Sequence, residues 1–484
     1  MPTFPKQTLL AIATFTAILL TVHYGVSGTT GLDPATLRPI ADFPSDRAAF
    51  FPIVKAPIPP LPTALAIPDP LAHGVKAAAN STLESQFLFD NNGALDHFYA
   101  ALRELHNGQS RRVVRIVHYG DSPTTADLIT GDTRELLQER FGNAGPGFIL
   151  IAKPWAWYGH HGVDVSGDGW KIDTAVGSMR EANYGLGGAV FTGPVGASSI
   201  IHLSAHDSTS IEVQYLEEPV GGNIDVTADG APIGEIKTAG DIKEDNATTL
   251  PIPHGTKQVE LRVSGSPVQV FGVAFATDAR GLTYDSIGLN GASTTVMSRA
   301  FNPQTFSAAL EHRNPDLVVI NYGTNESSYP AYVEKQYEPE LIRAISRVRA
   351  ALPNASILIM SPMDRGERDG DNITTMAAIP RIVAIQQRVA EKTGCGFFNT
   401  YQAMGGNGTM SVWYNRHPAM VGADLIHPSP QGARIVAQLL TGQLLIGYER
   451  YMENHPASQN KLSPPAISQT SGRQNRAARP VGVQ

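Results

Sequence analysis

The order of predicted strands and helices changes character twice along this chain of 484 residues, and that change constrains the fold most. From about residue 280 to 446, apolar runs that resemble strands alternate with helical segments, such as a strand over 355–362 and a helix over 378–394. A helix over 93–106 and a strand over 113–118 begin a similar unit earlier in the chain. Alternating strands and helices predict a parallel sheet with helices on both faces.

The segment between these two units has a different pattern. Short alternating runs, such as 210–216, 223–229 and 268–276, are separated by Gly, Asp, Asn and Pro. This pattern predicts an all-β sandwich. We therefore expect one α/β domain, formed by residues 81–150 and 279–450, that is interrupted by a β-sandwich insertion over 151–278.

The two ends of the chain differ from these domains. After Lys6, no Asp, Glu, Lys or Arg occurs before Asp33, and residues 8–22 form a largely apolar run. Residues 1–27 are expected to form either a cleaved signal peptide or an uncleaved anchor in an inner membrane, and both alternatives stay open. In either case the remainder is expected to be periplasmic or extracellular. Residues 28–80 predict a Pro-rich linker, and residues 451–484 a disordered tail.

Composition excludes several classes of function. The chain is 42% hydrophobic and 17% charged, which is typical of a soluble globular protein. Its net charge of −7 does not favour a nucleic-acid partner. The single cysteine, Cys395, excludes a disulfide framework and a cysteine-based zinc site. We expect this thiol to be buried and inert.

Several predicted strands end in small polar motifs. The strand over 113–118 is followed by Gly120-Asp121-Ser122, and later motifs are Asn290-Gly291, Gly323-Thr324-Asn325-Glu326 and Asp424-x-x-His427. Because the carboxyl ends of parallel strands meet at one edge of a sheet, all four motifs can lie close together.

These motifs supply each part of a serine hydrolase site. A serine needs a base, the base needs an orienting carboxylate, and the developing oxyanion needs hydrogen-bond donors. We assign these roles to Ser122, His427 and Asp424, with donors from the backbone N–H groups of Ser122 and Gly291 and from the Asn325 amide. Gly288 stays an alternative to Gly291. Asp121 and Glu326 are expected to support the loops through hydrogen bonds.

The four motifs, in this order and without a G-x-S-x-G elbow, resemble the SGNH/GDSL hydrolase family. Within it the chain is most similar to periplasmic peptidoglycan O-acetylesterases and related polysaccharide esterases, which carry a β-sandwich like a carbohydrate-binding module at this place. The resemblance implies an SGNH-hydrolase-like sheet and an acetyl-serine intermediate on Ser122, with no metal or organic cofactor. One difference is Pro123, because this subgroup usually has His directly after the serine.

The resemblance implies a serine esterase that removes O-acetyl groups from an envelope or secreted polysaccharide. Peptidoglycan is the first candidate substrate and an exopolysaccharide such as a cellulose-like glucan the second. Two alternatives stay open: a polysaccharide O-acetyltransferase that uses the same triad, and a non-catalytic carbohydrate-binding protein.

Two further groups of side chains suggest binding sites. Four aromatic residues could stack on sugar rings or form a hinge core instead: Trp155, Trp157, Tyr158 and Trp170. His160-His161 suggests a metal site, but no carboxylate cluster with metal-ligand spacing accompanies the pair, so we expect no metal there.

Overall fold

The computed structural model describes residues 87–108, 113–177 and 181–456. The predicted N-terminal segment, the Pro-rich linker and the tail beyond residue 456 lie outside these ranges. Within the described part of the chain, no helix has both the length and the apolar character needed to cross a membrane.

A six-stranded sheet forms the centre of the α/β part, in the order β1-β19-β16-β15-β2-β14. All neighbouring strands are parallel except the short edge strand β1, which is antiparallel to β19. The strands are β1 (Leu88–Phe89), β2 (Val113–Gly120), β14 (Gly281–Gly288), β15 (Leu317–Asn321), β16 (Ser356–Met360) and β19 (Gly396–Phe398). The predicted parallel sheet is confirmed.

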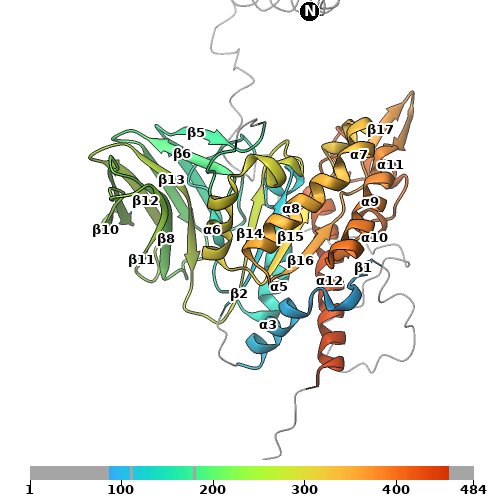
Figure 1. Ribbon diagram of the computed structural model, residues 1–484, viewed down its shortest axis with the longest axis horizontal. Helices are drawn as coiled ribbons and strands as arrows, with labels where there is room; N and C mark the ends of the chain where they lie inside the picture. Colours follow the sequence, from blue (N-terminus) through green and yellow to red (C-terminus); the bar gives the residue numbers. More distant parts are fainter. Residues whose placement is uncertain (1–86, 109–112, 178–180, 457–484) are drawn as a thin grey trace, which may run out of the picture. The chain divides into compact units, whose positions relative to one another are not determined.

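Helices cover both faces of this sheet, as Figure 1 shows. The longer ones are α3 (Asp96–His106), α5 (Leu128–Phe141), α6 (Pro303–Arg313), α8 (Tyr337–Ala351), α9 (Ala378–Thr393) and α12 (Pro430–Asn454). Alternate residues of β15 belong to two different cores: Leu317 and Val319 pack in one, and Val318 and Ile320 in the other. This alternation is what a sheet buried on both faces requires.

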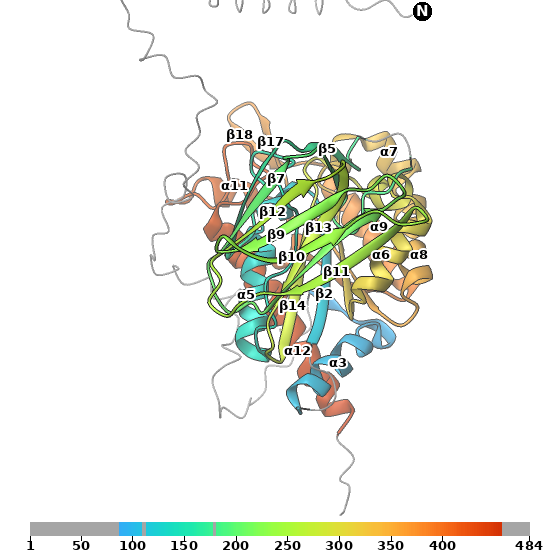
Figure 2. The ribbon, with the colours of Figure 1, turned by 90° about the vertical axis from the view of Figure 1, so that its left-hand side faces the viewer.

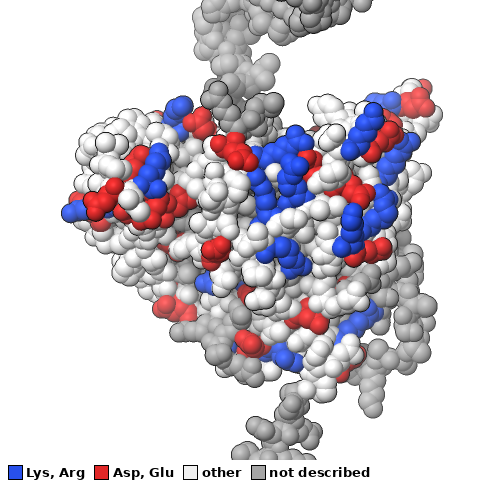
Figure 3. Space-filling view, in the orientation of Figure 1, with Lys and Arg blue, Asp and Glu red and all other residues white. Residues whose placement is uncertain are grey.

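Shorter helices and one hairpin complete the α/β part. The helices are η3 (Asn91–Gly93), α4 (Ser122–Thr125), η4 (Val296–Ala300), η5 (Glu326–Ser328), α7 (Pro330–Lys335), α10 (Thr400–Ala403) and α11 (Thr409–Tyr414). The hairpin consists of β17 (Gly366–Asp369) and β18 (Asn372–Thr375). Over α7, α8 and α9, basic and acidic side chains lie side by side (Figure 3), and Arg381 pairs with Glu334 there.

The insertion is a two-sheet antiparallel sandwich, and Figure 2 shows its strands β9, β10 and β12 toward the reader. One sheet has the order β10-β9-β12-β7-β4 and the other β11-β8-β13-β6-β5, with β3 paired to β13. The strands are β3 (Gly147–Ile149), β4 (Val163–Asp168), β5 (Lys171–Thr174), β6 (Ala189–Gly193), β7 (Ser198–Leu203), β8 (Ser210–Glu217), β9 (Asn223–Ala228), β10 (Ala231–Lys237), β11 (Glu244–Pro251), β12 (Gln258–Ser264) and β13 (Val268–Ala276).

The sandwich joins the α/β part through buried contacts at β14. The Asp285 carboxylate of β14 accepts hydrogen bonds from the Phe148 amide of β3, at 2.9 Å, and from the guanidinium of Arg313. The Tyr119 hydroxyl of β2 donates to the Leu186 carbonyl. One set of contacting buried side chains runs through both parts.

The carboxyl ends of three neighbouring strands are in register. Gly120, the last residue of β2, pairs with Gly288 at the end of β14 and with Asn321 at the end of β15. The loops that follow these strands carry three of the four predicted motifs, so the sheet brings them to one edge.

Candidate active site

Ser122 is the first residue of helix α4, directly after the buried strand β2 and Asp121. Gly120 lets the chain turn tightly here, because a Cβ at this position would lie 2.2 Å from the Thr124 hydroxyl oxygen. Pro123 occupies the first turn of α4, where a backbone N–H has no partner within the helix. The residue that departs from the family pattern therefore suits the local structure.

The three predicted triad residues form one chain of hydrogen bonds. Nε2 of His427 lies 2.7 Å from the Ser122 hydroxyl, and Nδ1 of His427 lies 2.6 Å from Oδ2 of Asp424. The other carboxylate oxygen of Asp424 accepts from the backbone amides of Ile426 and His427. The contact to Asp424 fixes Nδ1 as the protonated nitrogen, which leaves Nε2 to accept the serine proton.

A tight turn between α11 and α12 positions the acid and the base. Leu425, between Asp424 and His427, has a φ of 59°, and its side chain is buried. Its carbonyl accepts from the Gly366 amide, and its amide donates to the Gly422 carbonyl. An L-residue in this left-handed conformation costs roughly 1–2 kcal/mol, and such strain is often found at functional sites.

Asp424 is held in its charged form. Burial favours the neutral acid, but the hydrogen bonds from His427 and from the two backbone amides outweigh it and lower the pKa of Asp424 below its usual value. The triad is nevertheless open to solvent, since the side chains of His427 and Asp424 are 45% and 48% exposed. Water can therefore reach the base.

The predicted oxyanion donors come from the start of α4 and from the loops after β14 and β15. The Leu289 amide donates to the Gly120 carbonyl, which places the loop after β14 against the start of α4. Gly291 in this loop is exposed and has a φ of 75°. Nδ2 of Asn325 donates to the Ala292 carbonyl at 2.7 Å, and its second hydrogen stays available because an amide NH₂ has two.

Gly288 has a different role from Gly291. A Cβ on Gly288 would lie 2.3 Å from the Thr125 backbone nitrogen, so this glycine allows β14 to approach α4 closely. A Cβ on Gly291 would meet only Val176, at 3.8 Å, so that position needs glycine for its backbone conformation alone.

Two buried carboxyl groups lie beside these loops. Glu326 accepts from the amide and hydroxyl of Thr294 and from the Gly323 amide, and so ties the two oxyanion loops together. Asp121 is buried beside the nucleophile, and its Oδ2 has no hydrogen-bond partner among the described residues. Burial, aided by the charge of Glu326, raises the pKa of Asp121 to about 7.

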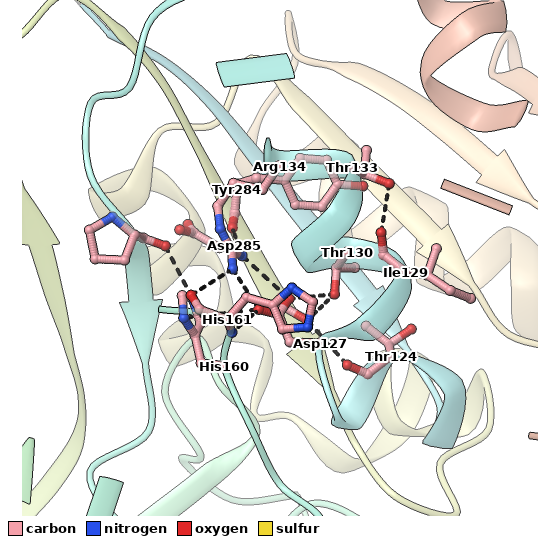
Figure 4. A network of polar contacts seen from close by, with 12 residues as sticks. Thr124, Asp127, Ile129, Thr130, Thr133, Arg134, His160, His161, Tyr284 and Asp285 are labelled. Carbon is pink, nitrogen blue, oxygen red and sulfur yellow. Dashed lines mark hydrogen bonds and ion pairs between the residues drawn. The ribbon is translucent and has the colours of Figure 1, made fainter. Parts of the chain in front are cut away.

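A buried ion pair behind the nucleophile was not predicted from the sequence (Figure 4). Asp127, fully buried between α4 and α5, pairs with Arg134 at 2.6 Å and accepts from the Thr130 hydroxyl and the His161 amide. Burial opposes its charge, but Arg134 and the adjacent histidines His160 and His161 hold the pKa of Asp127 well below its usual range. In the sequence, only the spacing Asp127-x₆-Arg134 indicates this ion pair. Such a spacing does not distinguish it from other pairs of opposite charge.

The ion pair of Asp127 and Arg134 also accounts for the position of the neighbouring histidines His160 and His161. His160 is buried beside Asp127, and burial lowers its pKa to about 3. Among the described residues, no group of three or more His, Cys, Asp or Glu side chains could hold a metal ion. Cys395 is buried, as expected from the sequence, and burial raises its pKa.

The four aromatic residues occupy different environments. Trp157 is 57% exposed, whereas Tyr158 is buried and its hydroxyl accepts from the Leu150 amide. Trp155 and Trp170 are half-buried against the core, and Nε1 of Trp170 donates to the Ser198 carbonyl. Of the four, Trp157 alone presents most of its surface to solvent.

Residues 264–435 match the model of the GDSL-like lipase/acylhydrolase family. This part of the chain is a GDSL-like acylhydrolase domain. The matched range covers β14, β15 and the loops with Gly291, Asn325, Asp424 and His427. The predicted SGNH/GDSL resemblance is thereby confirmed. No curated protein matches this chain.

Several solved structures are similar to this chain to different degrees, and the one with a TM-score above 0.5 shows the fold. A structure of a peptidoglycan O-acetylesterase superimposes with a TM-score of 0.65 at 24% identity, covering 75% of this chain and 99% of that one. A protein of Bacillus subtilis matches with a TM-score of 0.30 at 14% identity, over 58% of this chain and 90% of that one. The acetylxylan esterase Axe2 of Geobacillus stearothermophilus matches with a TM-score of 0.27 at 20% identity, over 35% and 74%.

Proposed function

We propose that this GDSL-like acylhydrolase removes O-acetyl groups from an envelope or secreted polysaccharide through an acetyl-Ser122 intermediate. The observation that carries the proposal is the continuous hydrogen-bonded chain from Ser122 through His427 to Asp424. This arrangement allows a hydroxyl to act as a nucleophile near neutral pH.

The reaction has two halves with balanced proton transfers. In the first, the Ser122 oxygen bonds to the acetyl carbonyl carbon while Nε2 of His427 takes the hydroxyl proton. The oxyanion receives hydrogen bonds from the Ser122 and Gly291 amides and the Asn325 side chain, and the sugar oxygen leaves with the proton from His427. In the second, water attacks acetyl-Ser122, His427 takes and returns one proton, and acetate leaves.

The exposure of the triad supports water as the acceptor. His427 and Asp424 are each almost half exposed, so bulk water has access to an acetyl group on Ser122. An acetyltransferase requires a sugar hydroxyl to outcompete this water. The test must therefore distinguish transfer of the acetyl group to a sugar hydroxyl from its hydrolysis by water.

Peptidoglycan is the first substrate to test, supported by the fold shared with a peptidoglycan O-acetylesterase. An acetylated glucan is the second. The proposed periplasmic or extracellular location, with or without a membrane anchor, is supported by the sequence of residues 1–27 alone. Either polysaccharide would be accessible to an enzyme in that compartment.

The test is acetate release by the purified full-length chain from O-acetylated peptidoglycan and from an acetylated glucan. Ser122→Ala is the inactive variant, and Ser346→Ala, on the exposed surface of α8, is the matched serine control. We expect acetate from at least one polymer, its loss in Ser122→Ala and no change in Ser346→Ala. Parallel reactions contain added chito- or cello-oligosaccharides as acceptors. If these acceptors become acetylated while little free acetate forms, the enzyme is a transferase. Equal behaviour of wild type and Ser122→Ala would overturn the proposal and favour a binding protein.

A further inference from the structure

Exposed aromatic side chains are rare in the described part of the chain. Six large hydrophobic residues are exposed there, and only Trp157 and Tyr329 are aromatic. A tryptophan that is 57% exposed presents a large aromatic surface that a ligand can contact. The position of Trp157 relative to the active site decides whether a bound substrate could contact this surface.

Trp157 lies against the oxyanion loop. Its indole Nε1 donates to Oδ1 of Asn290, at 3.3 Å, and Asn290 directly precedes Gly291. The Gly159 amide, two residues further on, donates to the Thr125 carbonyl at the end of α4. One short loop thus contacts both the nucleophile helix and the oxyanion loop.

Buried polar groups hold this loop on its other side. The Tyr158 hydroxyl accepts from the Leu150 amide, and His160 lies beside the buried Asp127 (Figure 4). The His161 amide donates to Asp127 at 2.7 Å. The exposed indole is therefore carried by a segment whose following residues, 158–161, are held by hydrogen bonds and burial. Such fixation reduces the entropy that a side chain loses on ligand binding.

We propose that Trp157 is a stacking platform for a sugar ring adjacent to the acetylated residue, and that it gives the enzyme its preference for polymers. This proposal rests on the proposed function. Sugar rings present apolar C–H faces, and large rigid aromatic faces next to a reaction centre bind such surfaces. The hydrogen bond from Nε1 fixes the indole edge and leaves the ring faces for contact.

The experiment compares two substrates and three variants. Acetate release is measured from the O-acetylated polymer and from ethyl acetate, which has no sugar or aromatic ring that could stack on Trp157. The variants are Trp157→Ala, Trp157→Phe and, as an exposed hydrophobic control in a sandwich turn, Val220→Ala. We expect Trp157→Ala to lower the ratio of kcat/KM for the polymer to kcat/KM for ethyl acetate about tenfold. The main cause would be a higher KM for the polymer.

Trp157→Phe separates stacking from loop positioning, because it keeps an aromatic face and loses the N–H donor to Asn290. We expect it to retain most of the polymer preference. Loss of activity on both substrates by the same factor in Trp157→Ala would show that Trp157 only positions the oxyanion loop, and would overturn the proposal. An unchanged ratio would overturn it as well.

A binding measurement keeps this test separate from the proposed function. Retention on insoluble O-acetylated polymer is compared for Ser122→Ala and for Ser122→Ala combined with Trp157→Ala. Weaker retention of the double variant supports the sugar platform even if the wild type releases no acetate. Equal retention would count against the platform, whatever the wild-type activity.

Discussion

At the scale of single residues, Asp121 was expected to support a loop, but its environment sets its charge in a way that the sequence did not predict. It directly precedes the nucleophile, is buried, and has one oxygen without a partner among the described residues. Its neighbour Glu326 is also buried but accepts three hydrogen bonds. Burial, aided by the charge of Glu326, raises the pKa of Asp121 to about 7, so this carboxyl group keeps its proton below about pH 7.

This raised pKa predicts that the folded protein loses stability as the pH rises. Between about pH 4, near the unfolded pKa, and about pH 7, the folded state binds more protons at Asp121 than the unfolded state does. The free energy of unfolding then falls by up to about 1.4 kcal/mol per pH unit. Asp121→Asn, which keeps the shape without the charge, is expected to remove this fall.

The measurement is urea unfolding of wild type and Asp121→Asn at several pH values from 4 to 8. The two stabilities should diverge with increasing pH, with the variant becoming the more stable one. Parallel curves would show that Asp121 is ionised throughout this range.

Sequence motifs predicted the triad residues and the supporting role of Glu326, but not the buried ion pair behind the nucleophile. Ser122, Asp424 and His427 are recognisable because each lies in a short motif at the end of an element. Asp127 and Arg134 lie in no such motif, and their pairing depends on the turn between α4 and α5, where Asp127 has a φ of 54°. Trp157 was one of four aromatic candidates, because exposure depends on how the sandwich packs.

At the scale of elements, the junction of α4 and α5 keeps the nucleophile in place. Asp127 and Arg134 are both buried, and Arg134 also donates to the carbonyls of Tyr284 and His161. The pair thus connects α5, strand β14 and the loop that carries Trp157 (Figure 4).

Removal of one partner of this ion pair is expected to be strongly destabilising. Asp127→Asn leaves the Arg134 charge buried without its counter-ion, at a cost of roughly 3–5 kcal/mol in the free energy of unfolding. The double variant with Arg134→Met removes the unpaired charge and should recover part of this loss. Chemical denaturation of the three proteins measures both effects; a double variant no more stable than the single one would contradict this explanation.

The close approach of β14 to α4 gives a second prediction for this junction. In Gly288→Ala, the new methyl group would lie 2.3 Å from the Thr125 nitrogen, so the backbone of α4 has to move. A displacement of about 1 Å at the nucleophile costs on the order of 10²-fold in rate. The kcat for ethyl acetate measures this loss.

Gly230→Ala is the control, because Gly230 lies in a sandwich turn with a φ of 82° and open space around it. It should lower stability slightly and leave kcat unchanged. A Gly288→Ala enzyme with wild-type kcat would show that α4 does not depend on this contact.

Elements with strong periodicity were predicted well, and short ones were not. Strands β15 and β16 are confirmed because each is a nearly continuous apolar run, and β2 and β14 because each keeps several buried apolar residues between turns. Strand β1 has only two residues, and the hairpin of β17 and β18 is largely exposed, so neither has a hydrophobic pattern. Helix α6 was missed because only Phe306 and Leu310 in it are buried.

At the scale of the whole molecule, the sandwich and the α/β part share one continuous core. Buried residues from β8 and β13 belong to the same contacting set as residues from β2, β15 and β16. Asp285 of β14 joins the Phe148 amide of β3 to Arg313 of α6. Sequence patterns predicted an α/β domain and a β-sandwich, but they did not predict that the two share one hydrophobic core.

This shared core predicts that both parts unfold together. We expect one calorimetric transition whose van't Hoff enthalpy approaches the calorimetric enthalpy, since loss of either part exposes the core of the other. Asp285→Asn should lower the midpoint without splitting the transition. Two resolved transitions in the wild type would contradict a common core.

The most direct test of the central claim is the site of acetylation during turnover. Full-length enzyme is mixed with excess ethyl acetate and quenched in acid within milliseconds, and its peptides are analysed by mass spectrometry. The account predicts an acetyl group on the peptide with Ser122, and none in Ser122→Ala, which should also release no acetate. An acetyl group on another residue, or undiminished acetate release by Ser122→Ala, would contradict it.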